Sequence, residues 1–187
     1  MTAPVAERDP AVGSNDAELG TIRAGSVAIR DALLRAGIDV VIHLPDSVLW
    51  QVPALLERAG VSTFVCARED EGVAMAAGAW LAGRRSVILM EGSGLGLSGL
   101  ILARCQIQRT PLLVIASHAL ALGEAFDYHG ATRLAGAGVL NGLNIPSVVV
   151  HDPRLLGSSV EQAAVTVQGQ RSIVGVFVPD FVMDPLP

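Results

Sequence analysis

The stretch that decides the fold runs from Ser86 to Gly99 and reads SVILMEGSGLGLSG. An apolar run typical of a buried strand leads into a glycine-rich turn, and the turn opens a segment with helical character. Within the turn, Gly94, Gly96 and Gly99 have the spacing G-x-G-x-x-G. A strand, a glycine turn and a helix in this order predict one repeat of an α/β protein.

The glycine spacing fails the tests for the common phosphate-binding turns. It follows the third predicted strand rather than the first, and the next strand ends at Ser117-His118, with no acid for a ribose. No Lys-Ser or Lys-Thr pair follows, which excludes a P-loop, and neither Ser93 nor Ser98 fits the G-x-S-x-G elbow. Two alternatives remain open: the glycines let a ligand ring lie against the backbone, or they let a helix pack closely on the sheet.

Apolar runs and amphipathic segments alternate along the rest of the chain. The predicted strands cover residues 38–44, 62–66, 86–90, 111–116, 147–150 and 172–178. The predicted helices cover residues 21–37, 48–60, 69–83, 98–108, 131–143 and 154–168. Because most strands are continuously aliphatic, we expect a single three-layer α/β domain, with a six-stranded, mostly parallel sheet and helices on both faces. We expect the domain to span residues 19–182, between a flexible tail at 1–18 and a short tail at 183–187.

Composition argues against several classes of protein. The net charge is −5 and no basic block is present, which disfavours a nucleic-acid surface. Cys66 and Cys105 lack the spacing of metal ligands and lie in apolar surroundings, so we expect buried thiols. With no signal-peptide pattern and no apolar run of membrane-spanning length, we expect a cytoplasmic protein.

Ligands bind to parallel sheets of this kind beyond the carboxyl ends of the strands. The corresponding turns lie at residues 45–47, 67–72, 91–96 and 117–130. In the second turn, Glu69, Asp70 and Glu71 begin a helix, where acids favour the helix dipole. Successive helical residues point about 100° apart, so the three carboxylates cannot share one role. Glu71 lies on the side of Met75 and Gly78, which we expect to face inward, and a carboxyl held there can relay a proton.

At these residues the sequence resembles a known family. Residues 68–96, REDEGVAMAAGAWLAGRRSVILMEGSGLG, look like the pyrimidine-binding domain of thiamine diphosphate enzymes. The segment is similar to the alpha subunit of sulfopyruvate decarboxylase and to the matching half of phosphonopyruvate decarboxylase, and the resemblance extends over residues 24–152. Members carry an acid-Glu-Gly or Asn-Glu-Gly step, a small-residue helix, a strand and a Ser-Gly-Leu-Gly turn. The resemblance implies a thiamine diphosphate-dependent decarboxylase of a 2-oxo acid, which is a carbon–carbon lyase.

The resemblance also implies which residues face the cofactor. The family's glutamate before the glycine matches Glu71, which would hydrogen-bond the pyrimidine ring nitrogen and so promote removal of the thiazolium C2 proton. The family's turn matches Ser93, Gly94, Leu95 and Gly96, whose backbone would lie against the cofactor. On this basis the glycines admit an aromatic ring rather than a phosphate.

Four further residues are candidates for catalysis or substrate binding. Asp46 stands where related decarboxylases carry an acid that faces the substrate, although one glycine of their Leu-Pro-Gly-Asp turn is missing here. The alternative for Asp46 is a helix N-cap shared with Ser47, which we favour slightly. His118 matches a Ser-His step of the sulfopyruvate enzymes and is a candidate to protonate the intermediate or bind substrate; the alternative is a bond to loop backbone. Ser47 and His129, the latter in a long loop that could form a lid, are candidate substrate-binding residues.

The sequence has no match to the Gly-Asp-Gly segment and downstream Asn with which this family binds Mg²⁺ and the diphosphate. We therefore expect no metal ligands in this chain and a separately encoded beta subunit that holds both groups. The active site would then be an interface that buries apolar surfaces around residues 71–82 and 94–107. Candidate cations for an anionic substrate tail are Arg68, Arg104, Arg109 and Arg133. Two alternatives are a catalytically silent scaffold or regulatory subunit, and a nucleotide-binding α/β module.

Overall fold

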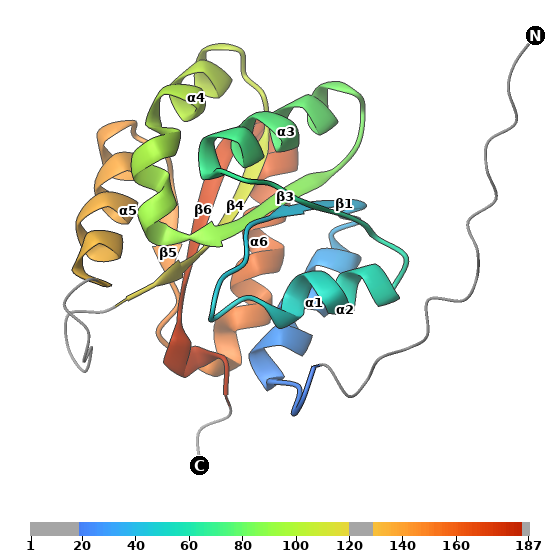
Figure 1. Ribbon diagram of the computed structural model, residues 1–187. Coiled ribbons are helices and arrows are strands. Elements are labelled where there is room, and N and C mark those ends of the chain that lie inside the picture. The colour runs from blue at the N-terminus through green and yellow to red at the C-terminus, as the bar shows by residue number, and fades with distance from the viewer. Residues whose placement is uncertain (1–18, 120–128, 185–187) are drawn as a thin grey trace, which may run out of the picture.

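The computed structural model describes residues 19–119 and 129–184, apart from the side chains at positions 131 and 133. The helices are α1 (Ala24–Arg35), α2 (Gln51–Arg58), α3 (Glu69–Leu81), α4 (Leu95–Ile107), α5 (Gly130–Gly142) and α6 (Leu156–Gln170) (Figure 1). The strands are β1 (Val40–His43), β2 (Ser62–Val65), β3 (Ser86–Glu91), β4 (Leu112–His118), β5 (Ser147–Val149) and β6 (Ile173–Pro179). The predicted tail at 1–18, most of the predicted loop at 117–130 and the end of the predicted tail at 183–187 lie outside the described residues.

The six strands form one sheet with the order β2-β1-β3-β4-β6-β5, and every neighbouring pair is parallel. The predicted fold class, a single α/β domain with a six-stranded sheet and helices around it, is confirmed, and the sheet is wholly parallel. All strands therefore begin at one edge of the sheet, the amino edge, and end at the other, the carboxyl edge. None of the described helices is both long and apolar enough to cross a membrane.

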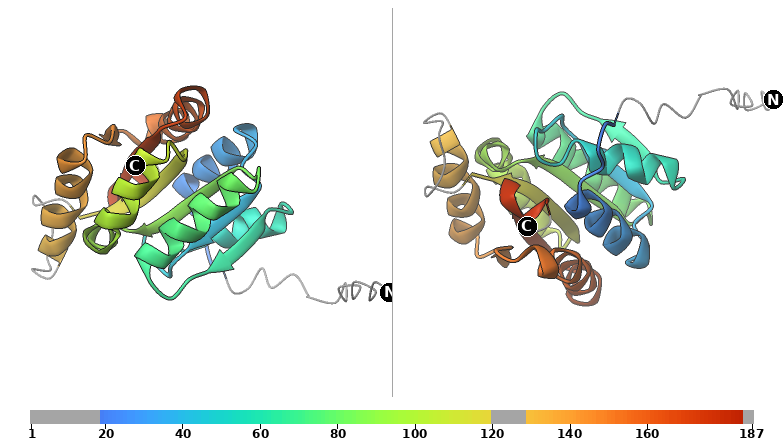
Figure 2. Two further views of the ribbon diagram at one scale, coloured as in Figure 1. Left: turned by 90° about the horizontal axis from the view of Figure 1, so that it is seen from above. Right: turned by 90° about the horizontal axis from the view of Figure 1, so that it is seen from below.

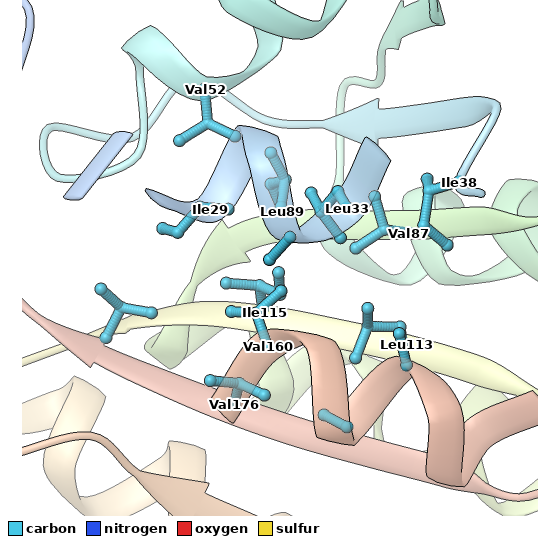
Figure 3. Close-up of a cluster of buried hydrophobic side chains, with 14 of the residues drawn as sticks. Ile29, Leu33, Ile38, Val52, Val87, Leu89, Leu113, Ile115, Val160 and Val176 are labelled. Carbon is cyan, nitrogen blue, oxygen red and sulfur yellow. The ribbon is translucent and has the colours of Figure 1, made fainter. Parts of the chain in front are cut away.

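Two apolar cores hold the helices on the two faces of the sheet, because successive strand residues point to opposite faces. On one face, Val87 and Leu89 of β3 pack with side chains from α1, α2 and α6 (Figure 3). On the other face, Ile88 and Met90 pack with side chains from α3, α4 and α5. Figure 2 shows the resulting layers from above and below. Most of these side chains are fully buried, so each face contributes a continuous core.

Helix ends follow local chemistry more than apolar pattern. Helix α1 ends two residues before Gly37, whose φ of +70° is a left-handed conformation that glycine adopts without strain. Helix α2 begins at Gln51, later than predicted, and Pro53 lies in its first turn, where a missing N–H costs nothing. The first predicted helix, at 21–37, is longer than α1, and Ile22 before the helix and Leu34 within it are exposed.

Candidate functional site

The order of the strands places a crevice position at the carboxyl ends of β1 and β3. From β1 the chain moves outward to β2, and it then returns past β1 to β3 on the other side. Such a reversal is the point at which open parallel sheets bind ligands. The segments that meet there are Leu44–Ser47 after β1, Gly92–Gly96 after β3, and Ser117-His118 at the end of β4.

Asp46 uses both carboxylate oxygens to hold the carboxyl edge together. Its Oδ1 accepts hydrogen bonds from the backbone N–H groups of Val48 (2.9 Å) and Leu49 (2.7 Å). Its Oδ2 accepts a hydrogen bond of 2.7 Å from the hydroxyl of Ser117 at the end of β4. Asp46 therefore caps the turn after β1 and ties that turn to β4. The expected helix N-cap does not form, because α2 begins at Gln51 and its N-cap residue, Trp50, has no side-chain hydrogen bond. Ser47, the second residue of the proposed cap, is exposed.

The three acids at the start of α3 have three different surroundings. Asp70 binds Arg68 through two contacts of 3.0 Å, and this side-chain hydrogen bonding is the main cause that lowers the pKa of Asp70. Glu71 is exposed, and its Oε2 accepts a hydrogen bond of 3.0 Å from the backbone N–H of Ala67. Glu69 is half-buried, and its side chain occupies the space where a Cβ at Gly94 would lie. Glu69 is thus the carboxylate of this group that contacts the glycine turn.

The prediction that Glu71 faces the protein interior is wrong. Met75 and Gly78, one turn and two turns further along that side of α3, are exposed as well. The buried side of α3 carries Gly72, Val73, Ala76 and Ala77. Glu69 precedes three of these residues by three, four and seven positions, which is the spacing of a single helical face. That spacing was the signal in the sequence that pointed to Glu69.

The glycine turn is a single 3-10 turn, Gly92–Gly94, that leads directly into α4. A Cβ at Gly92 would lie 2.6 Å from the Ser117 carbonyl oxygen, so at this position the glycine serves close packing. At Gly94 the nearest neighbouring atoms belong to the Glu69 side chain, beginning with its Cγ, so the glycine makes room for Glu69. Gly96 is exposed, whereas the Leu95 side chain is fully buried in the core and leaves only its backbone for a ligand. The close-packing alternative therefore holds at Gly92, and the approach of a ligand ring to Gly94 and Gly96 stays a prediction.

Two histidines reach the neighbourhood of this edge. His118 ends β4 and is half-buried, with its ring 5.1 Å from the ring of Phe177. Its Nδ1 is buried without a hydrogen-bond partner in the structure as described. Burial lowers the pKa of His118, and the nearby His151 lowers it further, so the imidazole is neutral at neutral pH. His129 precedes the first residue of α5 and is partly buried.

The candidate cations are distributed over both edges of the sheet. Arg68 lies at the carboxyl edge but is paired with Asp70. Arg104 and Arg109 lie in the last turn of α4 and after it, at the opposite, amino edge. The side chain of Arg133 lies outside the described part of the chain. In residues 19–119 and 129–184, no group of three or more His, Cys, Asp or Glu residues is arranged to hold a metal ion.

This arrangement agrees with a comparison of the sequence with known families. The family described as thiamine pyrophosphate enzyme, N-terminal TPP binding domain, matches residues 23–130. The chain belongs to this family. The match covers β1 through β4 and hence the turns that carry Asp46, Glu69, the glycines and His118.

Curated relatives in the thiamine pyrophosphate enzyme family are named sulfopyruvate decarboxylase subunit alpha. The protein from Methanococcus maripaludis is 35% identical over 95 residues, which cover 50% of this chain and 57% of that protein. The protein from Methanothermobacter thermautotrophicus is 33% identical over 123 residues, covering 65% and 74% respectively. The match to the Methanocaldococcus jannaschii protein, 37% identical over 98 residues, again spans 57% of that relative.

Solved structures show the same fold at low sequence identity. A 2-oxoglutarate:ferredoxin oxidoreductase from Magnetococcus marinus superposes with a TM-score of 0.70 at 20% identity, over 86% of this chain and 29% of that one. Benzoylformate decarboxylase from Polynucleobacter necessarius gives a TM-score of 0.68 at 19% identity, over 88% and 31%. The chain therefore has the fold of one domain within these larger enzymes.

The residues present at the crevice fit the pyrimidine end of thiamine diphosphate. Glu69 offers a carboxyl group beside a turn in which Gly94 and Gly96 carry no side chains of their own. A carboxyl group hydrogen-bonds a ring nitrogen, and a turn without Cβ atoms lets a flat ring approach the backbone. Glu69 is also in the first turn of α3, whose residues Gly72 and Val73 are buried against the sheet, and this packing holds its backbone in place.

An apolar surface extends along the exposed sides of α3 and α4, from their first turns beside the crevice to their last turns at the amino edge. Its exposed large residues are Met75, Leu81, Leu97, Leu100 and Ile107. Ile107 is 85% exposed and Leu81 is 74% exposed, which is unusual for side chains on the helices of a packed domain. We call this set the α3/α4 surface.

Proposed function

We propose that this chain is the pyrimidine-binding subunit of a thiamine diphosphate-dependent decarboxylase that acts on a 2-oxo acid. The observation that carries the proposal is the contact between the Glu69 side chain and Gly94 at the switch point of the sheet. The naming of the curated relatives supports a substrate of the sulfopyruvate type, and phosphonopyruvate stays a candidate from the sequence resemblance alone. Bound thiamine diphosphate would supply the ring that accepts electrons as carbon dioxide leaves the substrate.

The role of this chain in the reaction is to orient the cofactor and to move protons. We assign to Glu69 the role that the resemblance gave to Glu71, because Glu69 contacts the glycine turn whereas Glu71 is exposed and binds the Ala67 amide. The Glu69 carboxyl group would hold the proton that it shares with the pyrimidine nitrogen. The backbone of Ser93, Gly94, Leu95 and Gly96 would support the ring. A fixed carboxyl group of this kind contributes about 10²–10⁴-fold to a proton-transfer step.

The two histidines and the turn after β1 are the candidates for contacts with the substrate. Burial lowers the pKa of His118, and a neutral imidazole can accept a proton and, once protonated, give it to the substrate. Asp46 acts through Ser117, which it holds at the end of β4 one residue before His118. Ser47 is exposed beside this turn, and His129 precedes α5, so both remain candidates for substrate contacts.

The proposed active site is shared with a separate beta subunit. That subunit would hold Mg²⁺ and the diphosphate and would cover the α3/α4 surface, which is apolar and borders the crevice. An interface of this kind explains why Glu71 and Met75 share an exposed helix side in the isolated chain.

The test is calorimetric titration of thiamine diphosphate with Mg²⁺, first into the chain alone and then into the chain co-expressed with the product of its neighbouring gene. We expect binding, and decarboxylation of sulfopyruvate or phosphonopyruvate, only in the complex. A well-formed complex that neither binds the cofactor nor releases carbon dioxide would leave the scaffold or regulatory role instead.

Paired substitutions in that complex distinguish the two glutamates. Glu69→Gln should lower kcat by about 10²-fold or more with the complex intact, because it removes the ionisable proton and keeps size and hydrogen bonding. Glu71→Gln, two residues away on the exposed side of the same helix, is the matched control and should keep most of the activity. The reverse result would return the role to Glu71.

A further inference from the structure

A hydrogen bond outside the residues considered above connects the end of β3 to the start of α5. The Thr132 hydroxyl donates to Oε1 of Glu91 over 2.7 Å, between residues that are 41 positions apart. Glu91 is the last residue of β3 and immediately precedes the glycine turn. Thr132 is only 2% exposed. A buried hydroxyl that donates to a carboxylate makes a short, strong bond, and leaving the acceptor unpaired would be costly.

The same helix also forms the packing surface of the turn. A Cβ at Gly92 would lie 2.7 Å from Cγ2 of Thr132, and a Cβ at Gly136 would lie 3.0 Å from the Gly92 carbonyl oxygen. One turn of chain later, the Cβ position of Gly96 is 3.3 Å from Cβ of Ala135. The first turns of α5 therefore pack directly on the backbone of the glycine turn, and the Glu91–Thr132 bond ties the end of β3 to α5.

We propose that Glu91 and Thr132 are positioning residues for the cofactor-facing turn, so that the first turn of α5 sets the geometry at Ser93–Gly96. This inference rests on the proposed function, because it takes that turn to be the cofactor's support. The requirement is for an acceptor at Glu91 and a hydroxyl at Thr132, not for a charge. Glu91→Gln, whose amide oxygen can accept the same bond, should therefore retain the geometry, and so should Thr132→Ser.

Hydrogen exchange on the purified chain tests the positioning itself, without cofactor or partner. Thr132→Val removes only the hydroxyl, and we expect it to speed amide exchange at residues 92–96 by about tenfold, the change that corresponds to the loss of a hydrogen bond of ordinary strength. Exchange in β6 should not change, which separates a local effect from general destabilisation. Thr132→Ser should restore the slow exchange. Thr166→Val is the matched control, since it removes a hydroxyl that donates to the Gln162 carbonyl on α6. Exchange at 92–96 that is unchanged in Thr132→Val, or that rises equally in β6, would overturn the positioning role.

Cofactor affinity of the assembled complex tests the link to function. In the calorimetric titration, Thr132→Val should raise the dissociation constant for thiamine diphosphate several-fold, with Thr132→Ser and Glu91→Gln close to the wild type. If the wild-type complex binds and the Thr132→Val complex binds equally well, the inference is wrong while the proposed function stands. If the wild-type complex does not bind thiamine diphosphate, the proposed function fails, and so does the proposed effect of Thr132 on cofactor affinity. The hydrogen-exchange experiment then tests only whether Thr132 positions the turn.

Discussion

The packing of the glycine turn makes an alanine substitution at Gly92 a sharp test of the structure. The new Cβ would lie 2.6 Å from the Ser117 carbonyl oxygen and 2.7 Å from Cγ2 of Thr132. Real Cβ atoms do not approach other atoms so closely, and the first neighbour is backbone of a central strand, so the turn or β4 must shift. Overpacking of this kind costs about 1–3 kcal/mol. For a domain of this size, a cost of about 2 kcal/mol lowers the melting temperature by roughly 4–8 °C.

Gly99 provides the matched control within the same segment. It lies inside α4, where a Cβ would be 3.6 Å from Cγ1 of Val139, an ordinary van der Waals distance. Replacing glycine by alanine within a helix stabilises by about 0.5–1 kcal/mol. Urea unfolding of the purified chain should therefore show opposite signs for Gly92→Ala and Gly99→Ala. A Gly92→Ala variant as stable as the wild type would refute the close approach between this turn and β4.

Two further predictions concern pH and assembly. Burial lowers the pKa of both His118 and His43 below the ordinary value of 6.5. The two imidazoles therefore bind protons more readily in the unfolded chain than in the folded one. The free energy of unfolding should be highest above neutral pH and should fall as the pH drops through 6.5. Urea unfolding at several pH values should show this loss, and His118→Gln should make it shallower; a wild-type stability that rises on acidification would contradict the assignment. Leu100→Asp should abolish co-purification with the beta subunit and leave the isolated chain stable, whereas Val165→Asp on α6, equally exposed at 63% against 65%, should assemble normally. Equal assembly of the two variants would place the interface elsewhere.

The sequence was sufficient to predict the architecture because the central strands are almost wholly buried. β3 and β4 contain uninterrupted runs of buried apolar residues, Val87–Met90 and Leu112–Ala116, and such continuous runs are distinctive of parallel strands covered on both faces. At Asp46 the sequence indicated a backbone cap, and the carboxylate does bind backbone N–H groups, but in the turn after β1 rather than at the start of α2. Contacts between distant segments could not be predicted from the sequence. The hydrogen bonds from Ser117 to Asp46 and from Thr132 to Glu91 depend on the strand order and on where the helices pack.

The error at Glu71 has a specific physical cause. Periodicity identifies the apolar side of a helix but does not identify what covers that side. Helix α3 is rich in apolar and small residues all round, and the structure buries Gly72, Val73, Ala76 and Ala77 while it exposes Met75, Gly78 and Leu81. The sequence pattern alone favoured the side of Met75 as the interior, and this turned the wrong glutamate inward.

The two apolar sides of α3 also support the proposed assembly. A helix that is apolar all round is stable in water only where both sides are covered. The sheet covers one side, and the exposed side continues onto α4 at Leu97 and Leu100. Glu69 and Glu71 stand at the same end of the helix, one against the glycine turn and one on the exposed side. A partner that covers the exposed side would therefore approach the crevice at Glu71 while leaving Glu69 to face the bound ring, which assigns one acid to the interface and the other to the chemistry.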